Sequence, residues 1–220
     1  MAWIDSSDLG AGFSSASDVP QRRRKVIGIG GTFRQGSGTE RLTRAVLAAC
    51  ERTGAETVMF DGQRLAQLPL FNPENPARTA EQRELVALAR GADAFVIGSP
   101  GYHGSYSGLV KNAIDLLEDL REDRRSYFDG RPVALIVTAA GWQACGTTLS
   151  ALRDVVHAMR GWPTPIGVAV NSASQKPFDA QGMLVDEGIR KCVDAQAAQI
   201  MSFGLRSLSV SAGHVLGEVR

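Results

Sequence analysis

Short apolar runs alternate with longer segments of helical periodicity along this chain, and this alternation restricts the possible folds more than any other feature. Apolar runs of strand length occupy residues 26–29, 57–60, 94–97, 133–137 and 166–170. Helical spacing of apolar residues follows in residues 39–52, 79–90, 109–117, 149–159 and 185–200. The runs are almost continuously apolar, which is typical of parallel strands covered on both faces. The pattern predicts an α/β fold, with a doubly wound five-stranded parallel sheet and helices on both faces.

Turn and capping signals agree with these boundaries. Thr79 and Gln82 have the capping-box spacing that opens a helix, and Gly54 and Gly91 each end one. The periodic segments predict one domain over residues 25–203. Residues 1–24 and 204–220 are rich in serine, glycine and charge without a lasting period, so we expect a mobile N-terminal extension and a mobile C-terminal tail.

The balance of charge and the use of cysteine argue against several classes of protein. Lys and Arg number 24 against 23 Asp and Glu in 220 residues, so no basic field would gather nucleic acid. Cys50, Cys145 and Cys192 are far apart, which argues against a disulfide framework and against a metal site built on thiolates. No apolar run approaches the roughly 20 residues of a membrane helix, and the start lacks the order of a signal peptide. We therefore expect a cytoplasmic protein that binds neither membrane nor metal.

Ligands of doubly wound sheets bind beyond the carboxyl ends of the strands, so the loops after strands one, three and four are the candidate binding segments. The first loop, residues 30–39, leads into the N-terminus of a helix, where free N–H groups favour an anion. Hydroxyl groups and one guanidinium there can bind phosphate oxygens; they belong to Thr32, Arg34, Ser37 and Thr39. A flexible connector with a serine N-cap is the alternative interpretation.

Two familiar phosphate motifs are absent from this first loop. A Walker loop requires lysine after its second glycine, but Gly36 is followed by Ser37. The dinucleotide fingerprint requires a third glycine where Phe33 stands. A monophosphate fits the loop better than a nucleoside triphosphate or a dinucleotide.

The loop after the third strand carries a longer motif, P-x-Y-x-x-S-x-x-G-x-x-K-N-x-I-D-x-L, formed by Pro100, Tyr102, Ser105, Gly108, Lys111, Asn112, Ile114, Asp115 and Leu117. The first loop matches a second motif, G-[ST]-x-R-x-x-S, through Gly31, Thr32, Arg34 and Ser37. With these two motifs in order, each at the end of its strand, residues 25–203 resemble the NAD(P)H-dependent FMN reductase family of flavodoxin-like proteins. The resemblance implies the flavodoxin-like strand order 2-1-3-4-5.

The resemblance also implies which residues bind FMN. The phosphate would be bound by Thr32, Arg34, Ser37 and Thr39 of the first loop. The isoalloxazine would lie along the loop after the third strand, at Pro100, Gly101, Tyr102, His103 and Gly104. Its pyrimidine edge would face the loop after the fourth strand, at Gly141, Trp142 and Gln143, although Trp142 equally fits a subunit contact.

The function implied is an oxidoreductase in which NADPH or NADH passes hydride to FMN by a ping-pong mechanism. The second acceptor would be a free flavin for a partner monooxygenase, a quinone or a similar small molecule. No catalytic side chain is assigned, because the cofactor carries the chemistry. The alternative is a flavodoxin-type electron carrier, but such carriers tend to be strongly acidic.

Self-association is the last expectation. The helix after Ser105 has adjacent apolar pairs at Leu109/Val110, Ala113/Ile114 and Leu116/Leu117, a wider stripe than one sheet face requires. The family is also oligomeric. Both observations predict a homodimer or homotetramer.

Overall fold

The computed structural model describes residues 22–204. Most of the predicted N-terminal extension and of the predicted C-terminal tail lies outside these residues. The strands are β1 (Lys25–Gly30), β2 (Glu56–Phe60), β3 (Ala94–Tyr102), β4 (Ser105–Tyr106), β5 (Pro132–Ala139), β6 (Trp162–Pro163) and β7 (Val168–Asn171). The helices are α1 (Gly38–Arg52), α2 (Gly62–Leu65), α3 (Ala80–Gly91), α4 (Gly108–Leu116), α5 (Trp142–Ala158) and α6 (Glu187–Ser202), with the 3-10 helix η1 (Leu117–Leu120) directly after α4.

The strands form one sheet in the order β2-β1-β3-β5-β6, with β7 also paired to β5. The pairs β1–β2, β1–β3, β3–β5 and β5–β7 are all parallel. Short strand β4 instead forms an antiparallel hairpin with the end of β3. With β6 and β7 counted as the two parts of the fifth strand, the order 2-1-3-4-5 and the flavodoxin-like fold are confirmed.

The fifth strand is interrupted rather than continuous. β6 pairs with the start of β5 and β7 pairs with its end, and the strand predicted at residues 166–170 is found at Val168–Asn171. Pro163 and Pro165 lie at the interruption. Proline cannot donate a backbone hydrogen bond, so a continuous ladder cannot form there.

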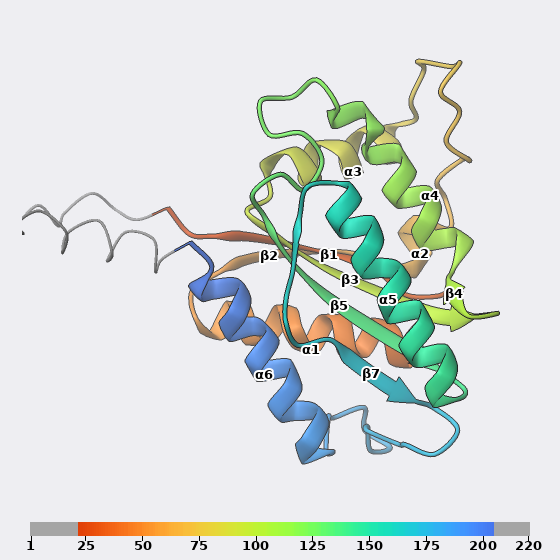
Figure 1. Ribbon diagram of the computed structural model, residues 1–220, viewed down its shortest axis with the longest axis vertical. Coiled ribbons are helices and arrows are strands. Elements are labelled where there is room, and N and C mark those ends of the chain that lie inside the picture. The colour runs from red at the N-terminus through yellow and green to blue at the C-terminus, as the bar shows by residue number, and fades with distance from the viewer. Residues whose placement is uncertain (1–21, 205–220) are drawn as a thin grey trace, which may run out of the picture.

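Two buried layers cover the sheet. Ile27 and Phe95 face the layer that contains α3, α4 and α5, whereas Val26 and Val96 face the layer that contains α1 and α6. Figure 1 shows the two groups of helices on opposite faces of the strands. Burial on both faces explains why the strands are apolar at successive positions.

The helix starts follow the capping signals in the sequence. The Thr79 hydroxyl accepts from the Gln82 N–H and the Gln82 side chain accepts from the Thr79 N–H, so the predicted capping box opens α3. Helix α5 begins earlier than its apolar period predicted, at Trp142 instead of near Leu149. Its first turns contain small residues such as Ala144 and Gly146, which leave no apolar stripe to detect.

Most of the apolar pairs predicted on α4 are buried against other parts of the same chain. Val110, Ala113, Ile114 and Leu116 are at most 4% exposed, and they pack in the same core as the sheet and α3. Helix α4 therefore leaves no wide apolar surface exposed, because it packs against the sheet, α2, α3 and η1. Self-association stays a prediction, but this stripe does not support it.

The predicted extension contacts the domain where the structure describes it. The Arg24 guanidinium donates to the carbonyl oxygens of Ile200 (2.6 Å) and Phe203 (2.9 Å) at the end of α6. Arg22 forms an ion pair with Asp93 at 2.6 Å. Within residues 22–204, no helix is both long and apolar enough to span a bilayer.

Candidate active site

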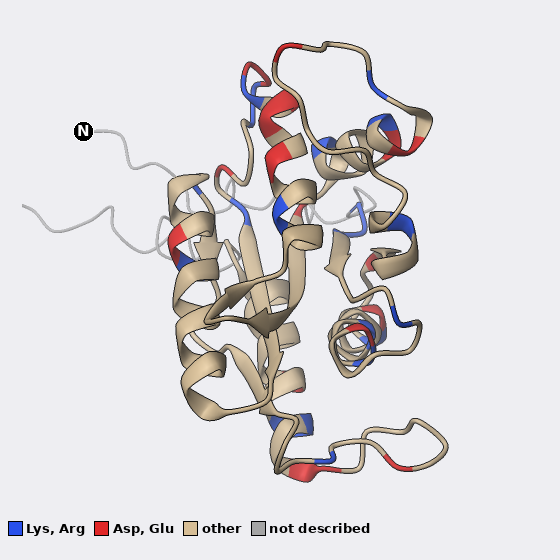
Figure 2. Ribbon diagram, turned by 90° about the vertical axis from the view of Figure 1, so that its right-hand side faces the viewer, with Lys and Arg blue, Asp and Glu red and all other residues tan. Residues whose placement is uncertain are grey.

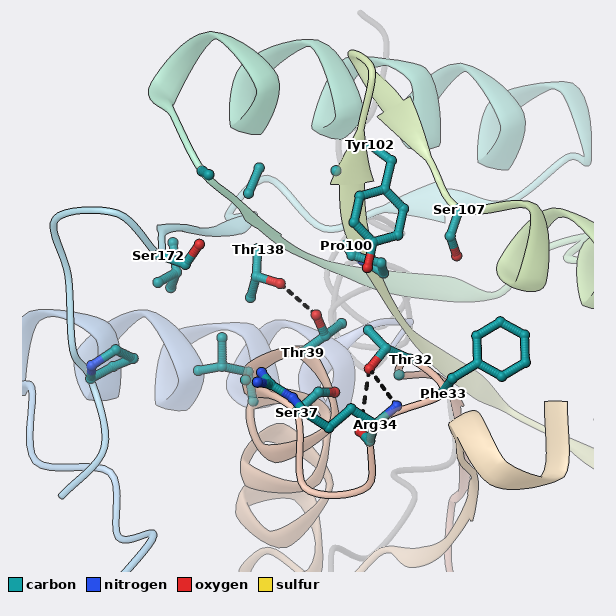
Figure 3. Close-up of a pocket in the computed structure, with 18 of the residues that line it drawn as sticks. Thr32, Phe33, Arg34, Ser37, Thr39, Pro100, Tyr102, Ser107, Thr138 and Ser172 are labelled. Carbon is teal, nitrogen blue, oxygen red and sulfur yellow. Dashed lines mark hydrogen bonds between the residues drawn. The ribbon is translucent and has the colours of Figure 1, made fainter. Parts of the chain in front are cut away.

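The carboxyl ends of β1, β3, β5 and β7 meet around one cavity of about 950 Å³, shown in Figure 3. This size falls within the range of ligand-binding pockets, roughly 300–1,000 Å³. Four segments line it: Gly31–Leu42, Pro100–Leu109, Thr138–Ala140 and Val170–Phe178 contribute residues. The cavity lies at the edge of the sheet where ligands of such folds bind.

The β1–α1 loop presents donors to this cavity. Ser37 is the N-cap of α1, and its hydroxyl accepts from the Glu40 N–H at 3.3 Å. Gly38 and Thr39 line the cavity and lie in the first turn of α1, where N–H groups have no partner within the helix. Arg34 extends along the same wall beside Ser37 in Figure 3. This combination favours an anion such as phosphate.

Two other interactions fix the shape of this loop. The Thr32 hydroxyl accepts from the Arg34 N–H (3.1 Å) and donates to the Arg34 carbonyl (3.2 Å). The Glu40 carboxylate is 5% exposed, accepts from the Gly36 N–H at 3.0 Å and is paired with Arg44 at 3.0 Å. Glu40 was missed in the sequence, because an acidic residue in a first helical turn is commonplace.

Hydroxyl groups join the loop to the floor of the cavity. The Oγ1 atoms of Thr39 and Thr138 are 2.5 Å apart, which links the start of α1 to the end of β5. Beneath this floor, the Cys145 thiol lies 3.4 Å from the Val170 carbonyl oxygen and is 1% exposed. Burial raises the pKa of the Cys145 thiol, which disfavours the thiolate form that a nucleophile requires.

The β3–β4 hairpin forms the opposite wall. Pro100, Gly101 and Tyr102 line the cavity, and the Tyr102 ring projects into it next to Pro100 in Figure 3. His103 and Gly104 form the two-residue turn and do not line it. Their φ values of 51° and 81° are both positive, as a type I′ hairpin turn requires. The structure therefore gives His103 a backbone role at an exposed turn.

The β5–α5 turn contributes Thr138, Ala139 and Ala140 to the cavity, while Gly141 and Trp142 lie just beyond its lining. Gln143, also predicted in the site, is likewise outside it. Gly141 is the N-cap of α5, and no side chain caps that helix. Its first-turn N–H groups are left to solvent or a ligand.

The segment after β7 was not foreseen from the sequence. One side of the cavity is formed by the end of β7, at Val170, and by residues that follow the strand: Ser172, Gln175, Lys176, Pro177 and Phe178. The signal was available, because the fifth strand ends at the same edge of the sheet as the other strands. Phe33, Leu42, Ser107, Gly108 and Leu109 also line the cavity without having been predicted.

The cavity lining has a positive charge. Arg34 and Lys176 are the only charged side chains in it, and it contains no carboxylate from the described residues. Figure 2 looks onto this edge of the molecule, where the ends of the central strands are tan and the charged residues lie on the surrounding helices and loops. An anionic ligand is favoured over a neutral or cationic one.

These residues fit FMN. The N-terminal turn of α1, with Arg34 and the Ser37 hydroxyl, matches a phosphate. Pro100, Tyr102 and Leu109 provide an apolar surface for a flat ring system. The uncapped start of α5 provides N–H donors beside that surface. The site thus defines a flavodoxin-like protein with room for a flavin mononucleotide.

The chain belongs to the NADPH-dependent FMN reductase family, whose sequence profile matches residues 24–175. It is similar to the FMN-dependent NADPH-azoreductase of Staphylococcus saprophyticus, at 34% identity over 159 residues, 70% of this chain and 81% of that protein. The FMN-dependent NADPH-azoreductase of Staphylococcus aureus is 30% identical over 187 residues, 81% of this chain and 94% of that protein.

Solved structures show the same fold. The flavoenzyme FerB, an NAD(P)H:(acceptor) oxidoreductase from Paracoccus denitrificans, superposes with a TM-score of 0.64 at 23% identity, over 82% of this chain and 98% of FerB. The apo form of the NADH:FMN oxidoreductase EMOB superposes with a TM-score of 0.59 at 18% identity, over 80% of this chain and 90% of that one.

Family membership confirms three predictions from the sequence. The family is that of the resemblance, the protein is an oxidoreductase, and the family description names FMN and NADPH as its cofactor and donor. Among residues 22–204, no group of three or more His, Cys, Asp or Glu side chains could hold a metal ion. The roles of the individual site residues remain predictions.

Proposed function

We propose that the chain binds FMN in the 950 Å³ cavity and uses it to reduce a second small molecule with NADPH or NADH. One observation supports this most: the same cavity contains a helix N-terminus suited to phosphate, at the start of α1, and an apolar wall suited to a flat ring. FMN, when bound, accepts hydride from the nicotinamide and delivers electrons to the acceptor.

The side chains and backbone groups of this chain would bind FMN and orient its ring. Arg34, Ser37 and the first turn of α1 would hold the phosphate, as would the Thr39 hydroxyl after exchange of its bond to Thr138. Pro100, Gly101 and Tyr102 would fix the ring plane. N–H groups at the start of α5 would stabilise negative charge developing at the pyrimidine edge. No side chain is required to transfer a proton.

Gly101 allows the cavity wall formed by the β3–β4 hairpin to lie close to β5 and α5. A Cβ atom there would be 2.8 Å from the Thr148 hydroxyl and 2.9 Å from Ala139 Cβ, so a larger residue would push the hairpin outward. The backbone of β3 therefore lies close to β5 and α5. This close approach sets the width of the space available to a ring.

The acceptor would be a planar molecule able to replace the nicotinamide over the ring, giving ping-pong kinetics. An azo compound, a quinone or free flavin for a partner monooxygenase all fit that description. The relatives named as azoreductases favour the first. Parallel double-reciprocal plots would support the proposal that donor and acceptor occupy the same position in turn, whereas intersecting lines would contradict it.

We also propose a homodimer that covers the mouth of the cavity. Phe33, Tyr102 and Trp142 are 72%, 56% and 58% exposed at or beside this mouth, and such side chains favour an interface. Light scattering should give twice the 23.5 kDa chain mass. A 23.5 kDa particle at micromolar concentration would contradict the dimer.

A visible spectrum of the purified protein, followed by anaerobic mixing with NADPH and with NADH, tests the main proposal. We expect a flavin spectrum that bleaches on addition of donor without another protein. A flavin that is bound but not reduced by either donor would instead favour the flavodoxin-type electron carrier.

A further inference from the structure

The cavity contains a second positive group that the FMN phosphate does not require. Arg34 and Lys176 come from opposite segments, the β1–α1 loop and the segment after β7. FMN carries one phosphate, for which Arg34 and the start of α1 suffice. Lys176 is exposed, and its Nζ donates only to the Ser172 carbonyl at 3.1 Å among the described residues.

The segment that carries Lys176 is held in one conformation by its own hydrogen bonds. The Asn171 side chain accepts from the Ala173 N–H at 3.1 Å, and the Gln175 side chain accepts from the Asn171 N–H at 2.9 Å. Further along, the Val185 N–H donates to the Pro177 carbonyl at 2.8 Å. Lys176 therefore extends from a fixed backbone at the rim of the cavity.

Arg41 connects this segment to the β1–α1 loop. Its guanidinium carbon lies 5.6 Å from the centre of the Phe178 ring. A Cβ atom on Gly36 would lie 3.7 Å from Arg41 Nη2, and one on Gly182 would lie 3.6 Å from Nη1, so the guanidinium lies between the two segments. Neither Arg41 nor Lys176 has a carboxylate within 4.0 Å among residues 22–204.

We propose that Lys176 binds the adenosine 2′-phosphate of NADPH, and that Arg41 positions the segment that carries Lys176. This inference rests on the proposed function, because the donor would lie over bound FMN and extend toward the rim. NADPH carries one dianionic phosphate more than NADH, and the cavity has one cation more than FMN requires. A flexible ammonium on an exposed stem suits a terminal phosphate. Lys176 would thus set the preference for NADPH.

Direct binding to the FMN-loaded full chain tests the contact without turnover. Adenosine 2′,5′-bisphosphate and adenosine 5′-monophosphate are titrated calorimetrically into the wild type, Lys176→Met and Lys191→Met. Lys191 is an exposed lysine of α6 paired with Glu187, which makes it a matched control. We expect the wild type and Lys191→Met to bind the bisphosphate more tightly than the monophosphate. The affinity of Lys176→Met for the bisphosphate should be about tenfold lower than that of the wild type.

Kinetics then separate the two phosphate positions of the donor. Lys176→Met should raise KM for NADPH about tenfold, with kcat, KM for NADH and the FMN dissociation constant unchanged. Arg41→Met should show the same pattern, and Arg41→Lys should recover part of it if the cation over Phe178 positions the segment.

Three results would overturn the proposal. Equal increases in KM for NADPH and NADH would place Lys176 at the pyrophosphate, and weaker FMN binding would place it at the FMN phosphate. Equal affinity of the wild type for the two adenosine nucleotides would remove the subsite altogether. All three leave the proposed function intact, whereas a wild type that binds no FMN, or is reduced by neither donor, would remove both.

Discussion

At the scale of single residues, the structure separates side chains that would touch a ligand from those that shape the backbone. Arg34 and Ser37 belong to the first group, because both line the cavity beside the start of α1. His103 belongs to the second, because it forms the hairpin turn at a positive φ. Replacing Arg34 should therefore affect the ligand, whereas replacing His103 should affect mainly the turn.

Replacing Arg34 should weaken FMN binding without unfolding the protein. Arg34 is exposed and is not paired with a carboxylate in the described chain, so its removal costs the fold little. Loss of a charge-assisted hydrogen bond is expected to cost about 1.5–3 kcal/mol, or roughly 10- to 100-fold in Kd. Flavin fluorescence titration of Arg34→Ala, with exposed Arg190→Ala of α6 as control, measures this. Unchanged affinity in Arg34→Ala would remove it from the site.

Flavin reduction should survive replacement of His103. Neither His103→Asn nor His103→Gln removes a group that lines the cavity, and asparagine tolerates the left-handed region better than glutamine. Both variants should keep the wild-type rate of anaerobic flavin reduction within a few-fold, with His103→Asn the more stable. Loss of flavin reduction in both variants would instead make His103 a general acid or base.

At the scale of elements, the β1–α1 loop depends on its packing against the start of α2. Gly62 opens α2, and a Cβ atom placed there would lie 2.0 Å from the Thr32 carbonyl oxygen and 2.7 Å from the Thr32 nitrogen. These are backbone atoms, so any side chain must displace the loop. The donors at the start of α1 would move with it.

Gly62→Ala should therefore destabilise the protein by about 1–3 kcal/mol and weaken FMN binding in the same variant. Gly91→Ala is the matched control, since an added Cβ meets no atom within 4 Å at the exposed end of α3. Urea unfolding of the apoproteins and FMN titration of both variants give the two quantities. Wild-type FMN affinity in Gly62→Ala would show that the loop does not depend on this contact.

At the scale of the whole molecule, the packing of α1 against α6 makes stability sensitive to alkaline pH. Cys50 of α1 is fully buried in the layer between these helices and the sheet. Burial, together with the charge of Glu51, raises the pKa of its thiol from 9.0 to about 12. The unfolded chain therefore releases this proton at lower pH than the folded chain.

That difference in proton binding determines how the free energy of unfolding changes with pH. Below about pH 9 both states retain the proton and Cys50 adds no pH dependence. Between about 9 and about 12 only the unfolded state loses it, so the free energy of unfolding falls by up to about 1.4 kcal/mol per pH unit. Cys50→Val should show a shallower fall than the wild type in urea unfolding across this range. Cys192→Val keeps Cys50 and should retain the wild-type slope; equal slopes in all three would refute the assignment.

The described residues should be sufficient for flavin binding. The lining residues named above and the seven strands of the described sheet come from residues 22–204. A chain of residues 22–204 should therefore bind FMN with the affinity of the full chain, measured by the same titration. Failure of this shorter chain to fold would show that residues 1–21 or 205–220 are structural.

The sequence by itself determined the class of fold, because apolar runs of strand length and helical periods depend on neighbouring residues. It also located the β1–α1 loop as part of the cavity wall, since the run from Thr32 to Thr39 is short and leads directly into a capped helix. Family membership and cofactor followed from two local motifs. All of these are properties of consecutive residues.

The tertiary structure decided which side chains of the segment after β7 share the cavity with the loops that the sequence had singled out. Lys176 and Phe178 meet Arg34 only because β7 pairs with β5 and ends at the same edge as β1. Tertiary packing also buried the apolar pairs of α4, which the sequence assigned to a subunit contact. The number of neighbours around a helix is set by the whole fold, and no local period encodes it. The positive φ of His103 likewise follows from the register of the hairpin, because Tyr102 pairs with Ser105 and leaves only two residues for the turn.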